Sequence, residues 1–201
     1  MKVVGFCGYS GSGKTTLVEQ IVARLRLAGH RVSVVKHAHH GFDIDQPGKD
    51  SHRHRAAGAY EVVIASNRRL AKIREYDVEA DPNVHQLIAE LSDPDWVLVE
   101  GFKRSDLPKI EIWRASTGQR VKYPHDPFVR AIATDSPEAL PLPTALPVLD
   151  LNDADAVTAW LLAHADGHDY RSPYDDADNE AAYVESAAGA GAPDRRHDGT
   201  G

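Results

Sequence analysis

The 201-residue sequence contains one cysteine and no apolar run near the ~20 residues that cross a bilayer. A single cysteine, Cys7, excludes an intrachain disulfide and fits a reducing cytoplasm. Because Cys7 lies in an apolar run, we expect it in the core and not as a nucleophile. The sequence begins in that run, without the successive regions of a secretory signal. We therefore expect a cytoplasmic protein that enters no membrane.

Acidic charge is concentrated at the carboxyl end, and the rest of the chain is nearly neutral. Residues 165–201 hold nine acidic side chains and three arginines, against a net charge of −7 for the whole sequence. This segment is rich in Ala, Gly and Asp and has almost no large aliphatic residues, which favours disorder. We expect a folded domain over 1–164 and a disordered tail over 165–201, with no nucleic-acid partner. Alternatively, three tyrosines dock the tail weakly on a partner: Tyr170, Tyr174 and Tyr183.

Residues 8–15 read Gly-Tyr-Ser-Gly-Ser-Gly-Lys-Thr and fit G-x-x-x-x-G-K-[ST], the phosphate-binding loop (P-loop) of nucleoside triphosphatases. Its glycines allow positive φ, so that backbone N–H groups can face a polyphosphate, and the following helix adds its positive end. Lys14 can reach the β- and γ-phosphates, and the Thr15 hydroxyl can bind Mg²⁺. The predicted nucleotide-binding residues here are Gly8, Ser10, Gly11, Ser12, Gly13, Lys14, Thr15 and Thr16.

Short apolar runs alternate with segments of helical periodicity. This alternation predicts an α/β fold of the P-loop NTPase type, with a mostly parallel twisted sheet and helices on both faces. Helical spacing follows the P-loop and recurs over 84–91 and from Asp153 to 162. A turn over 66–69 joins two of the strands. The expected strands are 3–7, 32–35, 61–65, 70–74, 96–99, 110–113, 129–133 and 147–150.

Glu100 directly follows the apolar strand 96–99. Ligand sites of parallel sheets lie at the carboxyl ends of strands, so Glu100 lies near the P-loop if the two strands are neighbours. A carboxylate there can bind the Mg²⁺ shell or orient an attacking water. The alternative is a solvated glutamate at a strand end.

The long polar stretch 37–58 follows the second strand, so it overhangs the same edge of the sheet. Asp43 and Asp45 form a D-x-D pair that can hold a hard cation. Arg53 and Arg55 would point apart on a helix but to one side on an extended segment. The stretch could also bind phosphate through its basic residues or a transition metal through its histidines, and the structural alternative is a solvated polar loop. Residue type alone does not decide among phosphate, Mg²⁺ and transition-metal binding. The candidate metal-binding histidines are His37, His39, His40, His52 and His54.

Together these motifs resemble the molybdopterin-guanine dinucleotide biosynthesis protein B (MobB) family over about residues 1–163. The P-loop is shared with a large superfamily, whereas the central motif and the Glu-Gly-Phe-Lys sequence are more specific. The resemblance rests on residues 8–16, 36–51, Arg53, Arg55, 57–59, 100–103 and 108–111.

The resemblance implies a homodimeric, Mg²⁺-dependent GTP-binding protein with slow GTPase activity. It would assist the guanylyltransferase that attaches GMP to molybdopterin, with that enzyme and the molybdopterin cofactor as partners. Glu100 would be the acid of the metal site, and Asp43, Asp45 and Lys49 would lie in a loop that faces nucleotide or cofactor. Water would be positioned by Glu100 or Asp43, and Arg53 or Arg55 would be the local candidate for an arginine finger.

The Asn-Lys-x-Asp guanine signature of many GTPases is absent from the sequence. Asp135, at the end of a late strand, is the nearest substitute and could accept hydrogen bonds from guanine N1–H and N2–H₂. Two other functions stay open: a metallochaperone GTPase that uses the histidines, and a small-molecule kinase that uses Arg53 and Arg55. Against the kinase, the later basic residues are too scattered for an arginine-rich lid: Arg114, Arg120 and Lys122.

Overall fold

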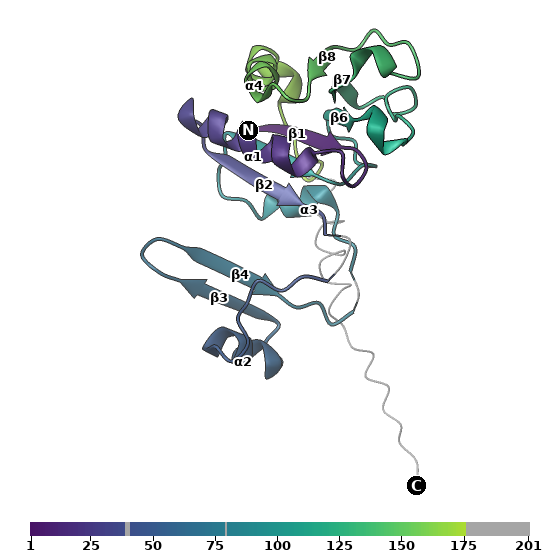
Figure 1. Cartoon of the computed structure of the whole chain (residues 1–201). Coiled ribbons are helices and arrows are strands. Elements are labelled where there is room, and N and C mark those ends of the chain that lie inside the picture. Colours follow the sequence, from purple (N-terminus) through teal and green to yellow (C-terminus); the bar gives the residue numbers. More distant parts are fainter. Residues whose placement is uncertain (39–40, 79, 176–201) are drawn as a thin grey trace. The chain divides into compact units, whose positions relative to one another are not determined.

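The computed structural model describes residues 1–38, 41–78 and 80–175. The chain divides into two compact units (Figure 1). In the described residues, the first unit comprises 1–38 and 83–172, and the second comprises 41–82 and 173–175. The predicted domain over 1–164 is thus interrupted in sequence by a second unit. No helix in the described ranges has the length and apolar composition to span a bilayer.

A six-stranded sheet forms the centre of the first unit, and every strand pair in it is parallel. The order β2-β5-β1-β6-β7-β8 confirms the predicted α/β fold with a parallel sheet. It also makes β1, which precedes the P-loop, a direct neighbour of β5, which ends at Glu100. The strands are β1 (Lys2–Cys7), β2 (Val32–Lys36), β5 (Trp96–Glu100), β6 (Lys109–Trp113), β7 (Val129–Thr134) and β8 (Val148–Asp150).

Helices cover both faces of this sheet, because alternate side chains of the buried strands point to opposite faces. On one face, Val4 and Leu98 pack with α1 (Lys14–Leu27) and α4 (Ala154–Ala163). On the other face, Val3 and Val97 pack with α3 (Val84–Ala89). Cys7 is buried as expected, and burial raises the pKa of its thiol to about 12.

The predicted starts of two helices are confirmed by their capping contacts. Asn83 and Gln86 form a capping box before α3, in which the Asn83 side chain accepts from the backbone N–H of His85. The Asp153 side chain accepts from the N–H of Ala156 at 2.9 Å and caps α4. Short 3₁₀ turns complete the unit: η1 (Ala115–Thr117), η2 (Pro137–Ala139) and η3 (Ala165–His168).

The first unit continues beyond the predicted boundary at residue 164. His168 is buried, and its ring lies 5.8 Å from that of Trp96. Asp169 forms an isolated bridge to Lys2, and the Tyr170 hydroxyl lies 2.9 Å from Nδ1 of His85. The predicted tail is therefore wrong for residues 165–170, which are anchored by these contacts. Residues 176–201 of that tail lie outside the described part of the chain.

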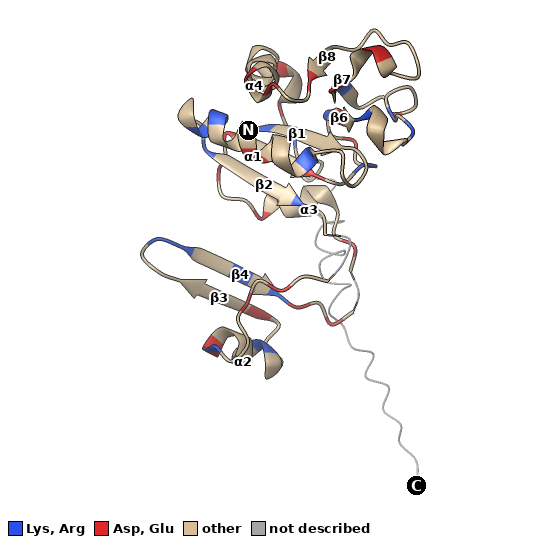
Figure 2. Ribbon diagram, in the orientation of Figure 1, with Lys and Arg blue, Asp and Glu red and all other residues tan. Residues whose placement is uncertain are grey.

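The second unit consists of α2 (Asp50–Ala56) and an antiparallel hairpin of β3 (Glu61–Ala65) and β4 (Leu70–Arg74) (Figure 1). The hairpin and its turn over 66–69 were predicted from the sequence. Its turn carries two arginines, seen as the blue end of the hairpin in Figure 2. Helix α2 contains no buried residue, so it lacks the apolar periodicity that would have predicted it.

Candidate functional site

The P-loop joins β1 to α1 and takes a backbone path that only glycine allows at two positions. Gly8 has φ +150°, and a Cβ there would lie 2.3 Å from the carbonyl oxygen of Ile112. Gly13, with φ +94°, is the N-cap of α1 and offers no side chain to cap the helix. The N-cap residue therefore has no side chain that could cap the N–H groups of the first turn of α1. A helix N-terminus that binds an anion needs these N–H groups for the ligand.

The other P-loop residues differ in exposure. Ser12 is buried, and among the described residues its hydroxyl has no hydrogen-bond partner. Ser10, Gly11 and Thr16 are exposed, so they are accessible from solvent as a ligand-binding loop requires. The predicted nucleotide-binding residues of 8–16 thus form one continuous loop and helix start.

Lys14 is half-buried, and its ammonium group donates to the carbonyl oxygen of Tyr9 at 2.7 Å. Burial lowers the pKa of Lys14, whereas the negative charge of Glu100 acts in the opposite direction. A bound polyphosphate would add negative charge beside this ammonium and so favour its protonated form.

Thr15 and Glu100 meet across 85 residues of sequence. The Thr15 hydroxyl donates to Oε1 of Glu100 at 2.6 Å, and Glu100 is only 8% exposed. Oε2 of Glu100 lies 3.4 Å from Nζ of Lys36, at the end of β2. The strand order produces this cluster, because Lys36 and Glu100 end two adjacent strands in register, and Glu100 pairs with Phe6, one residue before the end of β1. A hydroxyl and a carboxylate in contact are the oxygen ligands that suit the shell of Mg²⁺.

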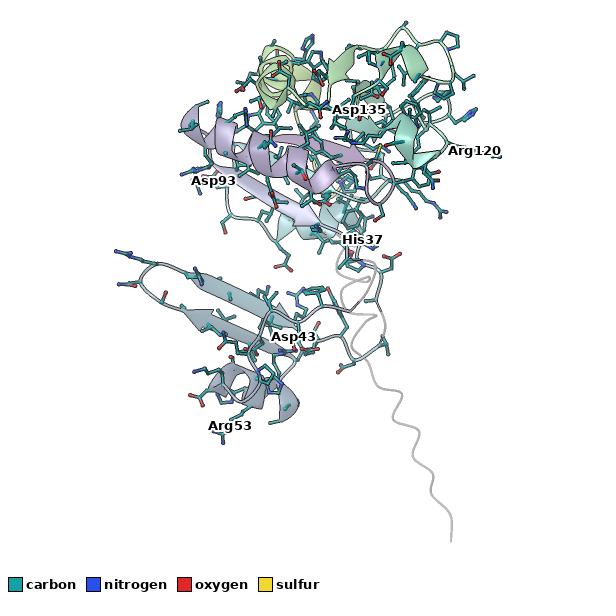
Figure 3. All side chains as sticks on the ribbon, in the orientation of Figure 1. His37, Asp43, Arg53, Asp93, Arg120 and Asp135 are labelled. Carbon is teal, nitrogen blue, oxygen red and sulfur yellow. The ribbon has the colours of Figure 1, made fainter. Side chains whose placement is uncertain are left out.

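Asp135 lies just after β7 at the same edge of the sheet, where Figure 3 labels it. Its Oδ2 accepts from Nη1 of Arg114, and its Oδ1 accepts from the Ser136 hydroxyl at 3.2 Å. Arg114 also donates from Nε to the carbonyl oxygen of Ser12 at 3.1 Å. Through Arg114, the predicted guanine-contacting carboxylate is connected to the P-loop.

Arg114 belongs to this site although the sequence does not predict it there. In the sequence it is one of several scattered basic residues, because its pairing with Asp135 depends on β6 and β7 being neighbours. One signal was available: Arg114 directly follows an apolar strand, at the carboxyl end where ligand sites form.

In the second unit, Asp43 and Asp45 contact an arginine within their own unit. Nη1 of Arg55 lies 3.0 Å from Oδ1 of Asp43 and 3.1 Å from Oδ2 of Asp45, and its Nε lies 2.6 Å from Glu75. Hydrogen bonds from the Asp45 N–H and Arg55 lower the pKa of Asp43, and the Ser51 hydroxyl and Arg55 lower that of Asp45. A structural role is therefore enough to explain why these charged side chains lie together. The contacts leave Arg55 committed to three carboxylates instead of free to act as an arginine finger.

The other predicted residues of the second unit are more exposed. Arg53 and Arg55 do point apart on α2, as predicted for a helix: Arg53 extends outward in Figure 3, with Asp50 at 3.7 Å. Lys49 is the exposed N-cap of α2. In the part of the chain that is described, no group of three His, Cys, Asp or Glu side chains could hold a metal. Two of the five candidate histidines, His39 and His40, lie outside that part.

Comparison with known proteins identifies related chains that match most of this sequence. The family model described as "Molybdopterin guanine dinucleotide synthesis protein B" matches residues 3–135. The molybdopterin-guanine dinucleotide biosynthesis adapter protein of Escherichia coli K12 is 37% identical over 166 residues, which is 79% of this chain and 93% of that protein. The adapter protein of the same name from Haemophilus influenzae is 39% identical, over 79% of this chain and 89% of its own.

Solved structures show the same relationship. The crystal structure of a MobB homologue from Bacillus stearothermophilus superposes with a TM-score of 0.62 at 31% identity, over 83% of this chain and 99% of that one. The structure of Bacillus subtilis MobB gives a TM-score of 0.64 at 25% identity, over 81% and 97% of the two chains. The resemblance found in the sequence is thereby confirmed, and the chain belongs to the MobB family.

Proposed function

We propose that the protein is a cytoplasmic GTP-binding adapter of molybdopterin-guanine dinucleotide biosynthesis. It binds GTP·Mg²⁺ at the P-loop and assists the guanylyltransferase that joins GMP to molybdopterin. The role as an adapter is supported by the names of relatives that match most of the chain. The observation that carries nucleotide binding is the contact of Thr15 with Glu100, beside the helix start at Lys14.

In this proposal the residues of the P-loop hold the phosphates, and Thr15 and Glu100 form the magnesium site: the Thr15 hydroxyl is the ligand, and Glu100 orients it. The Thr15 hydroxyl donates its proton to Glu100, so its lone pairs are left for a cation. A Mg²⁺ ion at the site formed by Thr15 and Glu100 would supply positive charge that offsets the negative charge of the phosphates. Asp135 would accept from guanine N1–H and N2–H₂, since its two oxygens lie at the ligand edge of the sheet.

Hydrolysis would be slow. Rapid GTPases need a group that orients water and an arginine that stabilises the transition state. Here Arg55 is bound by Asp43, Asp45 and Glu75. Glu100 remains the proposed water-orienting carboxylate, and it is already bonded to Thr15. Binding, more than turnover, is therefore the proposed use of GTP.

The proposed homodimer would use the hairpin of the second unit. A two-stranded hairpin is marginal alone, and this one exposes Val63, Ile64 and Leu70 at 58%, 42% and 68%. Exposed apolar surface of this kind is typical of protein interfaces. A Leu70→Lys variant should sediment as a monomer where the parent protein sediments as a dimer. A parent protein that is monomeric at micromolar concentration would contradict the dimer.

The Lys14→Ala variant tests the nucleotide site. It should lose most GTP affinity in isothermal titration calorimetry, because the ammonium group that reaches the phosphates is gone. Lys2→Ala is the matched control, since Lys2 pairs with the exposed Asp169 on the same unit. Unchanged GTP affinity in Lys14→Ala would exclude the P-loop as the binding site. For the adapter role, adding the protein to the purified guanylyltransferase should raise GMP transfer, and Lys14→Ala should not.

A further inference from the structure

Arg114 joins two parts of the proposed site that are far apart in sequence. It follows β6, its Nε donates to the carbonyl oxygen of Ser12 at 3.1 Å, and its Nη1 donates to Oδ2 of Asp135. The side chains of Arg114 and Asp135 are 28% and 24% exposed, so the pair is partly shielded from water. The guanidinium also lies against the P-loop, since a Cβ on Gly13 would be 3.5 Å from its Nη2.

The contact with Ser12 fixes the direction of a P-loop N–H group. The carbonyl of Ser12 and the N–H of Gly13 belong to one trans peptide unit, in which the two groups point in opposite directions. When Arg114 holds that carbonyl, the N–H of Gly13 is directed away from the arginine. An N–H group at the P-loop with a fixed direction is a preorganised donor for phosphate oxygen.

The contact with Asp135 fixes the direction of a carboxylate but leaves it able to accept more hydrogen bonds. Each carboxylate oxygen has about two lone-pair positions. Arg114 and the Ser136 hydroxyl use one on each oxygen, which leaves one on each for further donors. Guanine offers such a pair of donors, N1–H and N2–H₂, whereas hypoxanthine offers N1–H alone.

We propose that Arg114 is the positioning residue for selection of the nucleotide base. Its one guanidinium holds both the Asp135 carboxylate and the Ser12–Gly13 peptide, and so couples base selection to the P-loop. This inference rests on the proposed GTP site and adds to it the residue that orients its specificity. A planar guanidinium serves this purpose because it donates in two fixed directions, which a lysine ammonium does not.

The test is the affinity for GTP, inosine triphosphate and ATP by isothermal titration calorimetry, in the full chain. Arg114→Gln should lower GTP affinity by at least about tenfold, equivalent to about 1.4 kcal/mol. It should also bring the ratio of GTP to inosine triphosphate affinity close to one, because Asp135 is no longer held for the second donor. Arg114→Lys should have a ratio between those of Arg114→Gln and the parent protein. Asp135→Asn should favour xanthosine triphosphate, whose O2 accepts from the new amide.

Arg24→Gln is the matched control. Arg24 forms a two-pronged pair with Asp155 on the same unit, at 2.6 and 2.9 Å. Removing that pair should leave the GTP to inosine triphosphate ratio unchanged. A purely structural role for Arg114 would change the melting temperature or all affinities equally, but not this ratio.

The outcomes separate this inference from the proposed function. If Arg114→Gln keeps the parental ratio, or if the parent protein binds both nucleotides equally, the role of Arg114 is refuted while GTP binding stands. If Arg114→Gln does not fold, the ratio in the folded Arg114→Lys variant decides: a parental ratio refutes the role. If the parent protein binds none of these nucleotides, the proposed function fails and the inference fails with it.

Discussion

Replacing Glu100 by Gln tests how the buried carboxylate acts on magnesium. Glutamine keeps the size of the side chain and an oxygen that can accept from the Thr15 hydroxyl, but it removes the charge. If Thr15 binds Mg²⁺, Glu100 orients that ligand, because its carboxylate accepts the 2.6 Å hydrogen bond from the Thr15 hydroxyl. Losing such an orienting partner lowers metal affinity by about 10- to 100-fold.

The same substitution should change stability only slightly. A hydrogen bond to a charged acceptor contributes about 1 kcal/mol more than one to a neutral acceptor. The ion pair with Lys36 contributes at most about 1 kcal/mol, since the Lys36 side chain is 55% exposed. Removing a charge from an 8% exposed site offsets part of both losses. The free energy of unfolding should therefore fall by less than about 2 kcal/mol.

The assay is GTP titration at a series of Mg²⁺ concentrations and in EDTA. We expect the midpoint in Mg²⁺ to rise about 10- to 100-fold in Glu100→Gln, while GTP affinity in EDTA stays near the parental value. Glu19→Gln, an exposed position on α1, is the control and should behave as the parent. A Glu100→Gln protein with parental Mg²⁺ dependence would refute the reasoning.

Four further substitutions have distinct expected results. Gly8→Ala should lower the free energy of unfolding in urea by about 3 kcal/mol, since its Cβ meets the Ile112 carbonyl, whereas Gly11→Ala should cost only about 1–2 kcal/mol of backbone strain. Burial lowers the pKa of His168 to about 4, so the unfolded chain binds the proton more readily below pH 6.5. Stability should fall by up to roughly 3 kcal/mol as pH drops from 6.5 to 4, and His168→Phe should flatten that part of the urea-unfolding profile. Tyr170→Phe loses the 2.9 Å contact with His85 and should lower stability by about 1 kcal/mol in the same assay. If neither His168→Phe nor Tyr170→Phe changes urea unfolding, residues 168–170 do not anchor the fold.

Much of the first unit was predictable because its signals are local. The run 96–99 is fully buried, and an apolar run of that length between polar segments predicts a strand in a covered parallel sheet. The P-loop is a contiguous motif, and the position of Glu100 follows from the rule that ligand sites lie at the carboxyl ends of strands. The contact between Glu100 and Thr15 needed only one further fact, that β1 and β5 are neighbours.

Other features could not be predicted because they depend on pairs that are distant in sequence. The cluster around Arg55 joins carboxylates 12, 10 and 20 residues away, in a segment without apolar periodicity. Residues 165–170 match the acidic tail in composition, yet buried His168 and the Tyr170 hydroxyl anchor this segment to the first unit. The position of Arg114 after an apolar strand is a signal in the sequence, but its pairing with Asp135 depends on β6 and β7 being neighbours.

The most direct measurement is a titration of the parent protein with GTP and ATP, each with and without Mg²⁺. The P-loop, the Thr15–Glu100 contact and the position of Asp135 predict that GTP binds more tightly than ATP and that Mg²⁺ strengthens GTP binding. A preference for ATP, with ADP formed only when an acceptor is present, would instead support the small-molecule kinase. No difference between the nucleotides, or no effect of Mg²⁺, would contradict GTP·Mg²⁺ binding as the basis of the proposed adapter function.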